Sequence, residues 1–593
     1  MPPQTGPDEP GLEPTRDSLP VQELVALLRC PCCLGPGDLV IDGNDLLCPG
    51  CSHRFPFVRR VPVLLCEDRD VPVMPDDHQS NQIDDGTLDW LDSLDGYSLN
   101  LGAGATTRRP RRCVEIEYSV FRNTTAVANA HNLPFKDAVF SAVVSFNTFE
   151  HLADPEVAAN ELFRVLKPGG RLQLQTAFLQ PLHEGPFHFY NATEFGVRRW
   201  FAHFDVEDCF VPDNMSPQYA LGWIASTMLY HVGRELGPRD QQLVGSVSLQ
   251  DWDAFWDSPD HGGWAPAVAL GCLSQTALST VGFGFELRAK KPGQFVEKPA
   301  VTSSSRPSSG GFALDELVSL LRCPSCHGSS DLVIAGEQLV CCDCSHRFSL
   351  QRGVPVLLCE EREVPVMPDD HLSNPIDEST LGWLDSLDGY SLNLGAGATK
   401  RRPGRCIEVE YSLFRNTTTV ADAHNLPFKD GVFDAVVSFN TFEHLADPIV
   451  AARELHRVLS PGGRLRLQTA FLQPLHEEPA HFYNATEFGV RRWFADFDVQ
   501  DCFVPDNMTP AYTVAWLANH VLFHVDQERG EELKEMVGQI TLRQWARYWE
   551  DPNGRHGFLP AVFALLPLSV RAHFAAGFEI RASKPVQVDR PSF

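Results

Sequence analysis

The sequence predicts an α/β protein in which the same unit occurs twice. When the chain is aligned with itself at an offset of 293 residues, residues 131–155 (HNLPFKDAVFSAVVSFNTFEHLADP) match 424–448 at all but two of 25 positions. The register holds without a gap to the FELRAKKP and FEIRASKP segments near the end of each unit. Short apolar strands alternate with helical stretches, a pattern typical of a parallel sheet covered by helices. A repeat of this length indicates a duplicated module rather than a solenoid.

The strands of the first copy can be located from apolar runs and turn residues. They are expected at YSLNLGAG (97–104), RCVEIEY (112–118), TAVANA (125–130), FSAVVSFN (140–147) and RLQLQTAF (171–178). The segment DPEVAANELFRVL has helical periodicity and is expected to end at KPGG, because Pro and Gly terminate helices. After a long helical insertion, FELRAKK is expected to form a final edge strand.

Segments rich in Pro, Ser and Gly set the predicted domain boundaries, because such segments cannot bury a core. They predict a disordered N-terminus and a flexible linker between the two copies. The expected organisation is 1–20 disordered, 21–70 cysteine-rich domain, 86–292 larger domain, 293–311 linker, 312–363 second cysteine-rich domain and 379–586 second larger domain.

Charge and hydropathy restrict the class of protein. The formal net charge of −28 argues against the basic surface that duplex nucleic acid requires, so nucleic acid is a disfavoured partner. The N-terminal segment lacks the features of a signal peptide, and no run of about 18 apolar residues is present. We therefore expect a cytoplasmic protein that does not enter a membrane; the oligomeric state is not predicted.

Two sets of four cysteines have the spacing of metal knuckles. Each set consists of two C-x2-C pairs, which present four thiolates to one tetrahedral ion and predict a closed structural zinc site. The alternative is a set of reduced thiols. The predicted ligands are Cys30, Cys33, Cys48 and Cys51 in the first copy, and Cys323, Cys326, Cys341 and Cys344 in the second.

Other residues near the knuckles are interpreted as bystanders. Cys32 and Cys342 have no counterpart in the other copy, and His53 and His346 are expected at the surface because four thiolates already fill each site. Without an export signal, thiols or metal ligands are expected in preference to disulfides. The segment LLRCPCCLGPGDLVIDGNDLLCPGCSHRFPFVRRVPVLL at 27–65 resembles the zinc-ribbon domain of the activator subunit that partners several RNA and protein methyltransferases. The resemblance implies a stabilising or docking domain.

The glycine loop LGAGAT after the first strand is expected to face a ligand, because ligands of parallel sheets bind at the carboxyl ends of the strands. A dinucleotide site would need a helix that starts directly after the loop, to hold the pyrophosphate. Here the loop runs into TRRPRR, which is too short and proline-broken to form such a helix. The loop therefore favours a nucleoside ligand without phosphates.

The segments LNLGAGAT, VEIEY, ANAHNLPFKDAVFSAVVSFNTFEHLADP and ELFRVLKPGGRL, in that order, resemble class I S-adenosylmethionine-dependent methyltransferases, in particular the type 11 methyltransferase domain, over about a hundred residues of each copy. The resemblance implies a Rossmann-like fold and S-adenosylmethionine as cofactor. It assigns the glycines to the methionine moiety, the acid that ends strand two to the ribose, and the next residues to the adenine. The implied residues are Gly102, Gly104, Glu117, Asn129 and Leu133 with Phe135, and Gly395, Gly397, Glu410, Asp422 and Leu426 with Phe428.

Two further acids, Glu115 and Glu408, share a strand face with Glu117 and Glu410 by period-two alternation. They are expected to be solvated, although either acid of a pair could bind the ribose.

The methyl acceptor is expected near polar residues that follow strands four and five. Methyl transfer from a sulfonium needs an acceptor held in line and, where the acceptor is protonated, a nearby base. The candidate bases are His151, His183 and His188 in the first copy, and His444, His476 and His481 in the second. A solitary histidine is more often structural.

These patterns predict an S-adenosylmethionine-dependent methyltransferase with an unidentified acceptor, a small molecule being favoured. The second copy is expected to be the more active, because it has Asp422 and Asp434 where the first has Asn129 and Ser141. One alternative is a non-catalytic scaffold with degenerate folds. A second alternative, a nucleic-acid-binding zinc protein, is disfavoured by the acidity.

Overall fold

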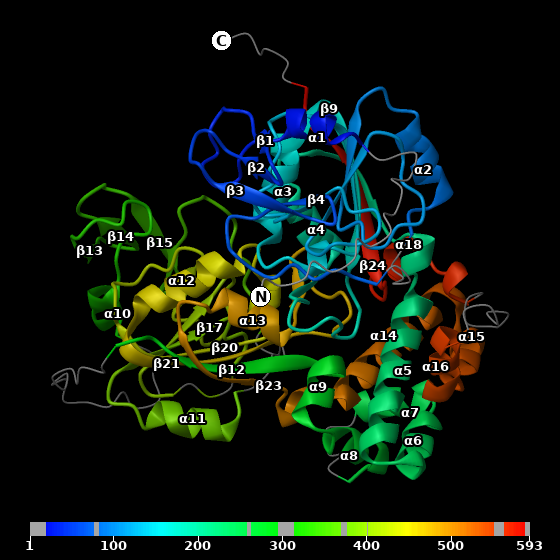
Figure 1. Ribbon diagram of the computed structural model, residues 1–593. Coiled ribbons are helices and arrows are strands. Elements are labelled where there is room, and N and C mark those ends of the chain that lie inside the picture. The colour runs from blue at the N-terminus through cyan, green and yellow to red at the C-terminus, as the bar shows by residue number, and fades with distance from the viewer. Residues whose placement is uncertain are drawn as a thin grey trace, which may run out of the picture. The chain divides into compact units, whose positions relative to one another are not determined.

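The structure is a computed structural model that describes residues 19–75, 82–257, 263–293, 313–368, 376–399, 401, 403–550 and 562–586 (Figure 1). The chain divides into two compact units. Unit 1 comprises residues 1–176, 198–210 and 579–593, and unit 2 comprises 177–197 and 211–578. Most of the predicted disordered N-terminus and linker lies outside the described residues.

Unit 1 contains one mixed sheet of 11 strands in the order β1-β2-β3-β4-β7-β6-β5-β8-β9-β24-β11. Its strands are β1 (Val40–Asp42), β2 (Asp45–Leu47), β3 (Arg54–Val58), β4 (Val61–Leu64), β5 (Tyr97–Leu101), β6 (Cys113–Glu117), β7 (Ala126–Ala128), β8 (Phe140–Phe146), β9 (Leu166–Ala177), β11 (Asp205–Phe210) and β24 (Gly577–Ser583). The strands from β7 to β9 are parallel, as the alternation of strands and helices predicts.

Four helical segments accompany this part of the chain: α1 (Val21–Leu27), α2 (Asp85–Asp92), η1 (Phe149–His151) and α3 (Pro155–Val165), and α4 (Glu194–Trp200) follows later. Helix α3 agrees with the predicted helix to within one residue at each end. The helix ends just before KPGG, as expected, but β9 begins at Leu166 and therefore includes this segment, in which Gly169 has a φ of +74° and the register to β8 shifts.

Unit 2 contains a second sheet of 11 strands in the order β13-β14-β15-β16-β19-β18-β17-β20-β21-β12-β23. Its strands are β12 (Gly284–Lys290), β13 (Leu332–Ile334), β14 (Gln338–Cys341), β15 (Arg347–Gln351), β16 (Val354–Leu357), β17 (Tyr390–Leu394), β18 (Cys406–Glu410), β19 (Thr419–Ala421), β20 (Phe433–Phe439), β21 (Leu459–Ala470) and β23 (Asp498–Phe503). A separate pair joins β10 (Tyr190–Ala192) and β22 (Tyr483–Ala485).

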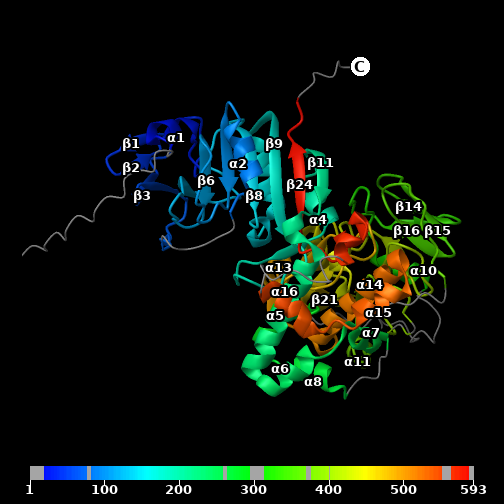
Figure 2. The ribbon, with the colours of Figure 1, turned by 90° about the vertical axis from the view of Figure 1, so that its right-hand side faces the viewer.

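The closing strand of each copy lies in the sheet of the other copy. Strand β12 of the first copy is antiparallel to both β21 and β23 of the second (Figure 1). Strand β24 of the second copy lies between β9 and β11 of the first (Figure 2). The expectation of a final edge strand is therefore wrong. The physical reason is burial on both faces, since the successive residues Phe285 and Glu286 point to opposite faces and both are buried; β11 and β23 form the edges instead.

Buried acids hold the exchanged strands. Glu286 on β12 is 1% exposed and accepts from Arg466 Nε at 2.8 Å and from Gln468 Nε2 at 2.7 Å, both on β21. In unit 1, Glu579 on β24 accepts from Gln173 Nε2 at 3.1 Å and from Gln175 Nε2 at 2.7 Å on β9. Each exchanged strand thus contributes a buried carboxylate to its new sheet.

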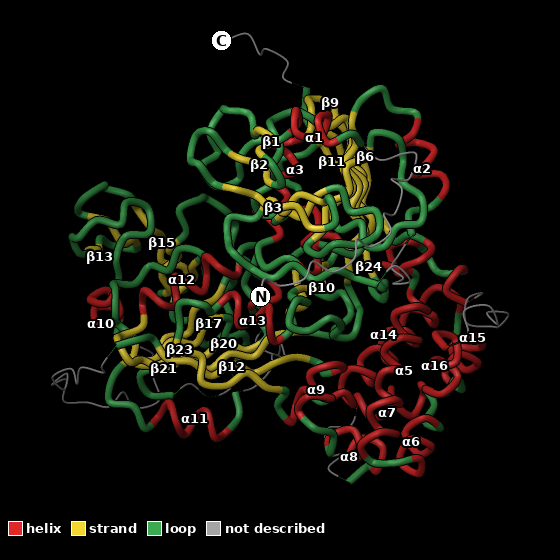
Figure 3. Tube along the Cα trace, viewed as in Figure 1, coloured by secondary structure: helices red, strands yellow, loops and turns green. Residues whose placement is uncertain are grey.

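In unit 2, helices of one copy also pack on helices of the other copy (Figure 3). They are η2 (Asp213–Met215), α5 (Pro217–Glu235), α6 (Pro238–Gly245), α7 (Leu249–Asp257), α8 (Ala265–Gly271), α9 (Gln275–Val281), α10 (Leu314–Leu320), α11 (Glu378–Asp385), η3 (Phe442–His444), α12 (Pro448–Val458), α13 (Glu487–Trp493), η4 (Asp506–Met508), α14 (Pro510–Arg529), α15 (Glu531–Gly538), α16 (Leu542–Glu550) and α18 (Leu568–Ala572). Helix α7 packs on α14, and α16 packs on α5.

The segments that directly precede α7 and α16 are hydrogen-bonded to each other. Leu249 N donates to Ile540 O at 3.0 Å, and Leu542 N donates to Val247 O at 3.1 Å. Stacked tryptophans follow on either side, Trp223 on Trp549 with centroids 4.7 Å apart and Trp256 on Trp516 at 5.2 Å. The exchange is thus built into the helical core as well as into the sheets. Within the described ranges, no helix combines the length and the apolarity needed to cross a bilayer.

Candidate functional site

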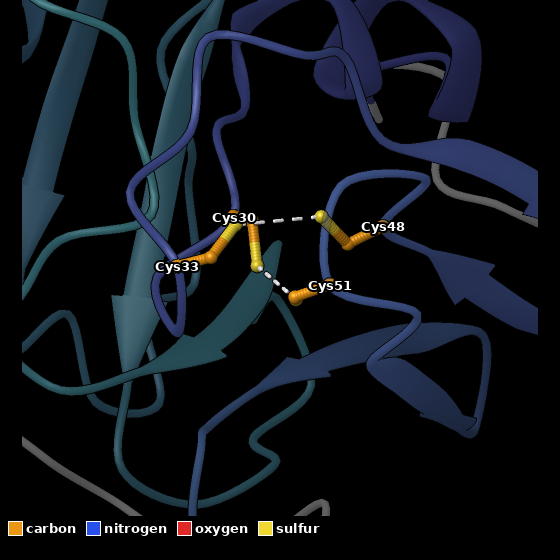
Figure 4. Close-up of side chains that lie close together, drawn as sticks. All are labelled: Cys30, Cys33, Cys48 and Cys51. Atoms are coloured by element: carbon orange, nitrogen blue, oxygen red, sulfur yellow. Dashed lines mark hydrogen bonds between the residues drawn. The ribbon is translucent and has the colours of Figure 1, made fainter.

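Both cysteine quartets converge as predicted, and Figure 4 shows the quartet of the first copy. Within each quartet the sulfur atoms lie within 4.8 Å of one another. Cys30 Sγ is 3.7 Å from Cys51 Sγ, and Cys323 Sγ is 3.8 Å from Cys344 Sγ. Zinc–sulfur bonds of about 2.3 Å place thiolates about 3.8 Å apart around a tetrahedral ion. The thiolates therefore fit a closed zinc site in each copy.

Cys32 differs from the expectation of an unpaired bystander. It forms a disulfide with Cys66, with the Cα atoms 5.4 Å apart. The chain that leaves β4 brings Cys66 back beside the first knuckle, within the range that a disulfide spans. The second copy has Ser325 and the free Cys359 at these positions. The expectation that the chain has no disulfide is therefore wrong for this pair, which lies outside the ligand quartet.

The second cysteine knuckle is bonded directly to the loop that follows β19. Asn425 Nδ2 donates to Pro324 O at 2.9 Å, and Arg322 N donates to Pro427 O at 3.1 Å. Strand β16, which ends the cysteine-rich segment, is parallel to β19 in the same sheet. The metal knuckle and the loop around Asp422 are therefore parts of one structure, and the first copy repeats the contact through Asn132 and Pro31 at 2.8 Å.

The glycine loop follows β17 at the point where the strand order of the sheet reverses, between β17 and β20. Gly395 and Gly397 have φ of +70° and +60°, a region that favours glycine. A Cβ at Gly395 would also collide with the Thr441 hydroxyl. Gly102 and Gly104 repeat these features in the first copy, at +72° and +62°, with Thr148 as the neighbour. Both loops thus require glycine at their first position.

The acid that ends strand two meets this loop. Glu410 accepts a hydrogen bond from the backbone N–H of Gly397, and Glu117 accepts one from Gly104. Burial raises the pKa of Glu410 to about 7, although the Gly397 N–H stabilises the ionised form. The carboxylate and the loop amides therefore lie together at the carboxyl ends of the parallel strands.

Glu115 and Glu408 were expected to be solvated, and this expectation is wrong. Both have no exposed surface. Thr399 Oγ1 donates to Glu408 at 2.8 Å, and Thr106 Oγ1 donates to Glu115 at 2.9 Å. Burial raises the pKa of Glu115 to about 7. The threonine hydroxyl thus ties the loop to the buried acid, whose carboxylate has no exposed surface.

The residues assigned to adenine form a tight turn. Asp422 Oδ1 accepts from His424 N at 2.9 Å and from His424 Nδ1 at 2.7 Å, which lowers the pKa of Asp422. Asn129 makes the same bonds to His131 at 3.0 Å and 2.9 Å. The Asp422 side chain is 49% exposed. The apolar residues assigned to adenine, Leu133, Phe135, Leu426 and Phe428, are fully buried and can support the turn only from beneath.

The three candidate histidines of the second copy are brought together. The ring centroids of His444 and His476 are 5.0 Å apart, and those of His476 and His481 are 4.2 Å apart. His481 is fully buried; its Nε2 lies 3.1 Å from Asn484 Oδ1 and its Nδ1 accepts from His476 N at 3.3 Å. Both of its ring nitrogens are thus occupied. Burial lowers the pKa of His476 to about 3, so this imidazole is neutral.

His444 has the chemistry of a base. Its Nδ1 lies 3.1 Å from Ala480 O, which fixes the proton on Nδ1 and leaves Nε2 as the acceptor. Nε2 lies 3.8 Å from Glu477 Oε2, and the side chain is 17% exposed. In the first copy, His188 is buried and pairs with Asn191 at 3.0 Å, His183 lies 4.3 Å from His188 between centroids, and His151 ends η1.

One acid beside this cluster was missed by sequence reasoning. Glu443 is fully buried; its Oε2 accepts from Thr469 Oγ1 at 2.9 Å, and its Oε1 has no hydrogen-bond partner in the described ranges. Burial raises the pKa of Glu443. One ligand atom from each of Glu443, His444 and His476 lies within 4.8 Å of the others, so these residues could hold a cation. The signal was the Glu-His pair after strand four in both copies.

Asp434, used above to distinguish the copies, lies at the start of β20. It accepts from Ser460 Oγ at 3.0 Å and abuts Gly389, before β17. This is the amino end of the strand, opposite to the glycine loop. Of the two aspartates that were used to distinguish the copies, only Asp422 therefore lies at the same end of the sheet as the glycine loop.

Comparison with known proteins gives a family for part of each copy. Residues 104–174 and 398–467 match a family model described as a methyltransferase domain. Among curated proteins, the ubiquinone/menaquinone biosynthesis C-methyltransferase UbiE of Haemophilus ducreyi is 30% identical over 118 residues, which are 20% of this chain and 42% of that protein. The UbiE of Vibrio cholerae is 30% identical over 128 residues, 22% of this chain and 44% of that protein. The chain thus covers less than half of these relatives.

Among solved structures, a geranyl diphosphate C-methyltransferase from Streptomyces coelicolor has 13% identity and a TM-score of 0.15, covering 21% of this chain and 60% of that one. A SAM-dependent methyltransferase from Methanosarcina mazei has 22% identity and a TM-score of 0.14, covering 16% and 59%. These alignments are too partial to support an argument. The family match stands on sequence: each copy contains a methyltransferase-family domain that begins within the glycine loop and ends in β9 or β21.

Proposed function

We propose that the protein is an S-adenosylmethionine-dependent methyltransferase with one cofactor crevice in each copy. One observation carries the proposal: at the start of the family-matched stretch, a left-handed glycine loop and the strand-two carboxylate meet where the strand order reverses. Ligands of open parallel sheets bind at this point. When bound, the cofactor would supply an electrophilic methyl group on sulfur.

The binding roles follow from the polar groups around the loop. Glu410 would accept the ribose hydroxyls, and the backbone at Gly395 would allow close approach of the methionine moiety. Asp422 keeps one carboxylate oxygen beyond its bonds to His424, and that oxygen would accept from the adenine amino group. Glu117, Gly102 and Asn129 would serve in the same way in the first copy.

The acceptor would lie beside the histidine cluster. We assign His444 as the base of the second copy, because its Nε2 is the acceptor nitrogen of a partly exposed ring. His481 would position the His476 loop, since both of its nitrogens are occupied. The acidic composition favours a small-molecule acceptor over nucleic acid. The two cysteine quartets would each hold a structural zinc ion.

Matched glycine variants of the full chain test cofactor binding and compare the copies. Gly102→Val and Gly395→Val should each remove one S-adenosylmethionine site, because valine disfavours positive φ and would collide with the neighbouring threonine. Calorimetric titration should count two sites in the wild type and one in each variant. Failure of the wild type to bind cofactor would favour the scaffold alternative.

If the second copy is the more active, Gly395→Val should lower turnover at least tenfold and Gly102→Val much less. The reason is Asp422, since a charge-assisted bond to adenine is about twice as strong as a bond to a neutral amide. Methyl release from labelled cofactor, with a panel of small-molecule acceptors, measures this. Equal losses of turnover in the two variants would contradict the expectation that the second copy is the more active. They would not contradict the assignment of one cofactor site to each copy.

Cofactor affinity of the second copy should depend on pH. Because the pKa of Glu410 is about 7, the carboxylate that accepts ribose hydroxyls is increasingly protonated below this pH. The dissociation constant should therefore rise as pH falls from 8 to 6, by up to about tenfold per pH unit below the pKa. Titration of the Gly102→Val chain isolates this site. The Glu410→Gln variant should bind weakly with little pH dependence, and a flat wild-type profile would refute the assignment.

A further inference from the structure

Three histidines of the second copy lie together outside the cofactor crevice and outside the acceptor cluster, which consists of His444, His476 and His481. His520 and His524 lie one turn apart on α14, and His573 follows α18 directly. One ring nitrogen from each lies within 4.8 Å of one from each of the others. The centroids of His524 and His573 are 4.7 Å apart. Residues four apart on a helix share a face, so α14 presents two imidazoles to the third.

The orientation of these rings suits ligation. His573 Nδ1 lies 2.9 Å from Leu475 O, so the proton is held on Nδ1 and Nε2 is left as a ligand atom. Glu478 Oε1 lies 3.4 Å from His573 Nε2. His520 Nδ1 is buried and has no hydrogen-bond partner in the part of the chain that the structure describes. A buried unpaired nitrogen is costly and calls for an explanation.

The cluster is a property of one copy. At the offset of 293 residues, the first copy has Thr227, His231 and Thr280 in these positions. The shared fold therefore does not require the histidines, and the first copy provides an internal control, because His231 occupies the position of His524 on the equivalent helix α5.

We propose that His520, His524 and His573 form a binding site for a transition-metal ion, with zinc as the favoured occupant. Imidazole ligands suit zinc, copper and nickel, and three histidines without thiolates leave a fourth position for water or for Glu478. Zinc–nitrogen bonds of about 2.0–2.1 Å require ligand atoms about 3.4 Å apart, so the rings would draw together on binding.

The site adjoins the acceptor cluster. The centroid of Trp516 lies 5.3 Å from that of His520 and 5.0 Å from that of His476. His573 also holds the loop before His476, since Leu475 N donates to His573 O at 3.2 Å. A bound ion would therefore fix the loop before His476 to α14 and to the segment that leads into β24.

Metal counting on the full chain tests the site. Protein dialysed to retain only the ions of the two cysteine quartets is titrated with Zn²⁺, and bound metal is measured by equilibrium dialysis and elemental analysis. We expect one additional ion per chain in the wild type and in His231→Gln, and none in His524→Gln or His573→Gln. His444→Gln should retain it, which excludes the Glu443 cluster.

Cobalt supplies a readout that does not depend on a variant. Co²⁺ added to the zinc-loaded chain should give the visible bands of a nitrogen-ligated ion without sulfur charge transfer. The proposal would be overturned if the wild type took up no additional ion, if His524→Gln retained it, or if His444→Gln lost it. Sulfur charge-transfer bands would also overturn the proposal, because they would show that the added ion is bound by cysteines.

Discussion

Replacing Cys323 by serine is expected to remove one tightly bound zinc ion per chain and to impair the cofactor site of the second copy. Structural zinc contributes about 10–16 kcal/mol of apparent binding free energy to small domains, so loss of a thiolate should unfold the second cysteine-rich segment. The damage should spread, because Arg322 and Pro324 are bonded to the loop that carries Asp422. Elemental analysis and S-adenosylmethionine titration measure the two effects.

Two variants serve as controls for this experiment. Cys342→Ser changes an exposed cysteine of the same segment that is not a member of the quartet, and it should retain zinc and affinity. Cys30→Ser should produce the corresponding defect in the first copy only. Full zinc content in Cys323→Ser would refute the ligand assignment, whereas zinc loss with intact cofactor affinity would show that the knuckle does not support the Asp422 loop.

Removing the carboxylate of Glu286 should strongly destabilise the second sheet. The Arg466 side chain is only 18% exposed, and the variant would remove the carboxylate to which its Nε and Nη2 atoms donate at 2.8 and 3.1 Å. Breaking a buried ion pair on one side costs about 3–5 kcal/mol. Urea unfolding of Glu286→Ala should therefore show a large loss of stability and early exposure of Trp516, which stacks on Trp256.

The first copy offers a matched comparison. Glu579 accepts from the amides of Gln173 and Gln175, where the second copy has Arg466 and Gln468. Each acid also pairs with an exposed arginine of its own strand, Arg288 or Arg581, so the two sites differ in the additional pair with Arg466. The hydrogen bonds that Glu579 accepts from neutral amides are worth about 1–3 kcal/mol, so Glu579→Ala should be the milder variant. A variant with both Glu286→Leu and Arg466→Leu should recover part of the loss, since a buried pair can be replaced by apolar residues. Equal costs at Glu286 and Glu579 would contradict the role of the ion pair.

The central parallel strands and the cysteine quartets were predictable, because apolar period, turn residues and ligand spacing are local properties of the chain. The exchange of β12 and β24 was not. FELRAK and FEIRAS complement either sheet almost equally well, so the choice depends on the connecting helices and not on the strands.

Elements of the site escaped prediction for similar reasons. Alternation correctly placed Glu408 on the face of Glu410, but it could not show that Thr399 covers the inner acid. Cys66 is far from Cys32 in the chain and meets it only after β4 has formed. The histidines at 520, 524 and 573 depend on a contact between a helix and a later turn. The first copy keeps only one of the three, as His231; this difference was visible in the repeat alignment and was the available signal.

The exchanged strands also constrain how the chain can be made. On the ribosome, the first copy is synthesised before it can complete its sheet, because β24 belongs to the second copy and follows it in the chain. Until then the nascent sheet presents an open edge at β9, which chaperones or other chains can pair with. A stop codon or frameshift before β24 would therefore damage the sheet of the first copy as well as the second copy.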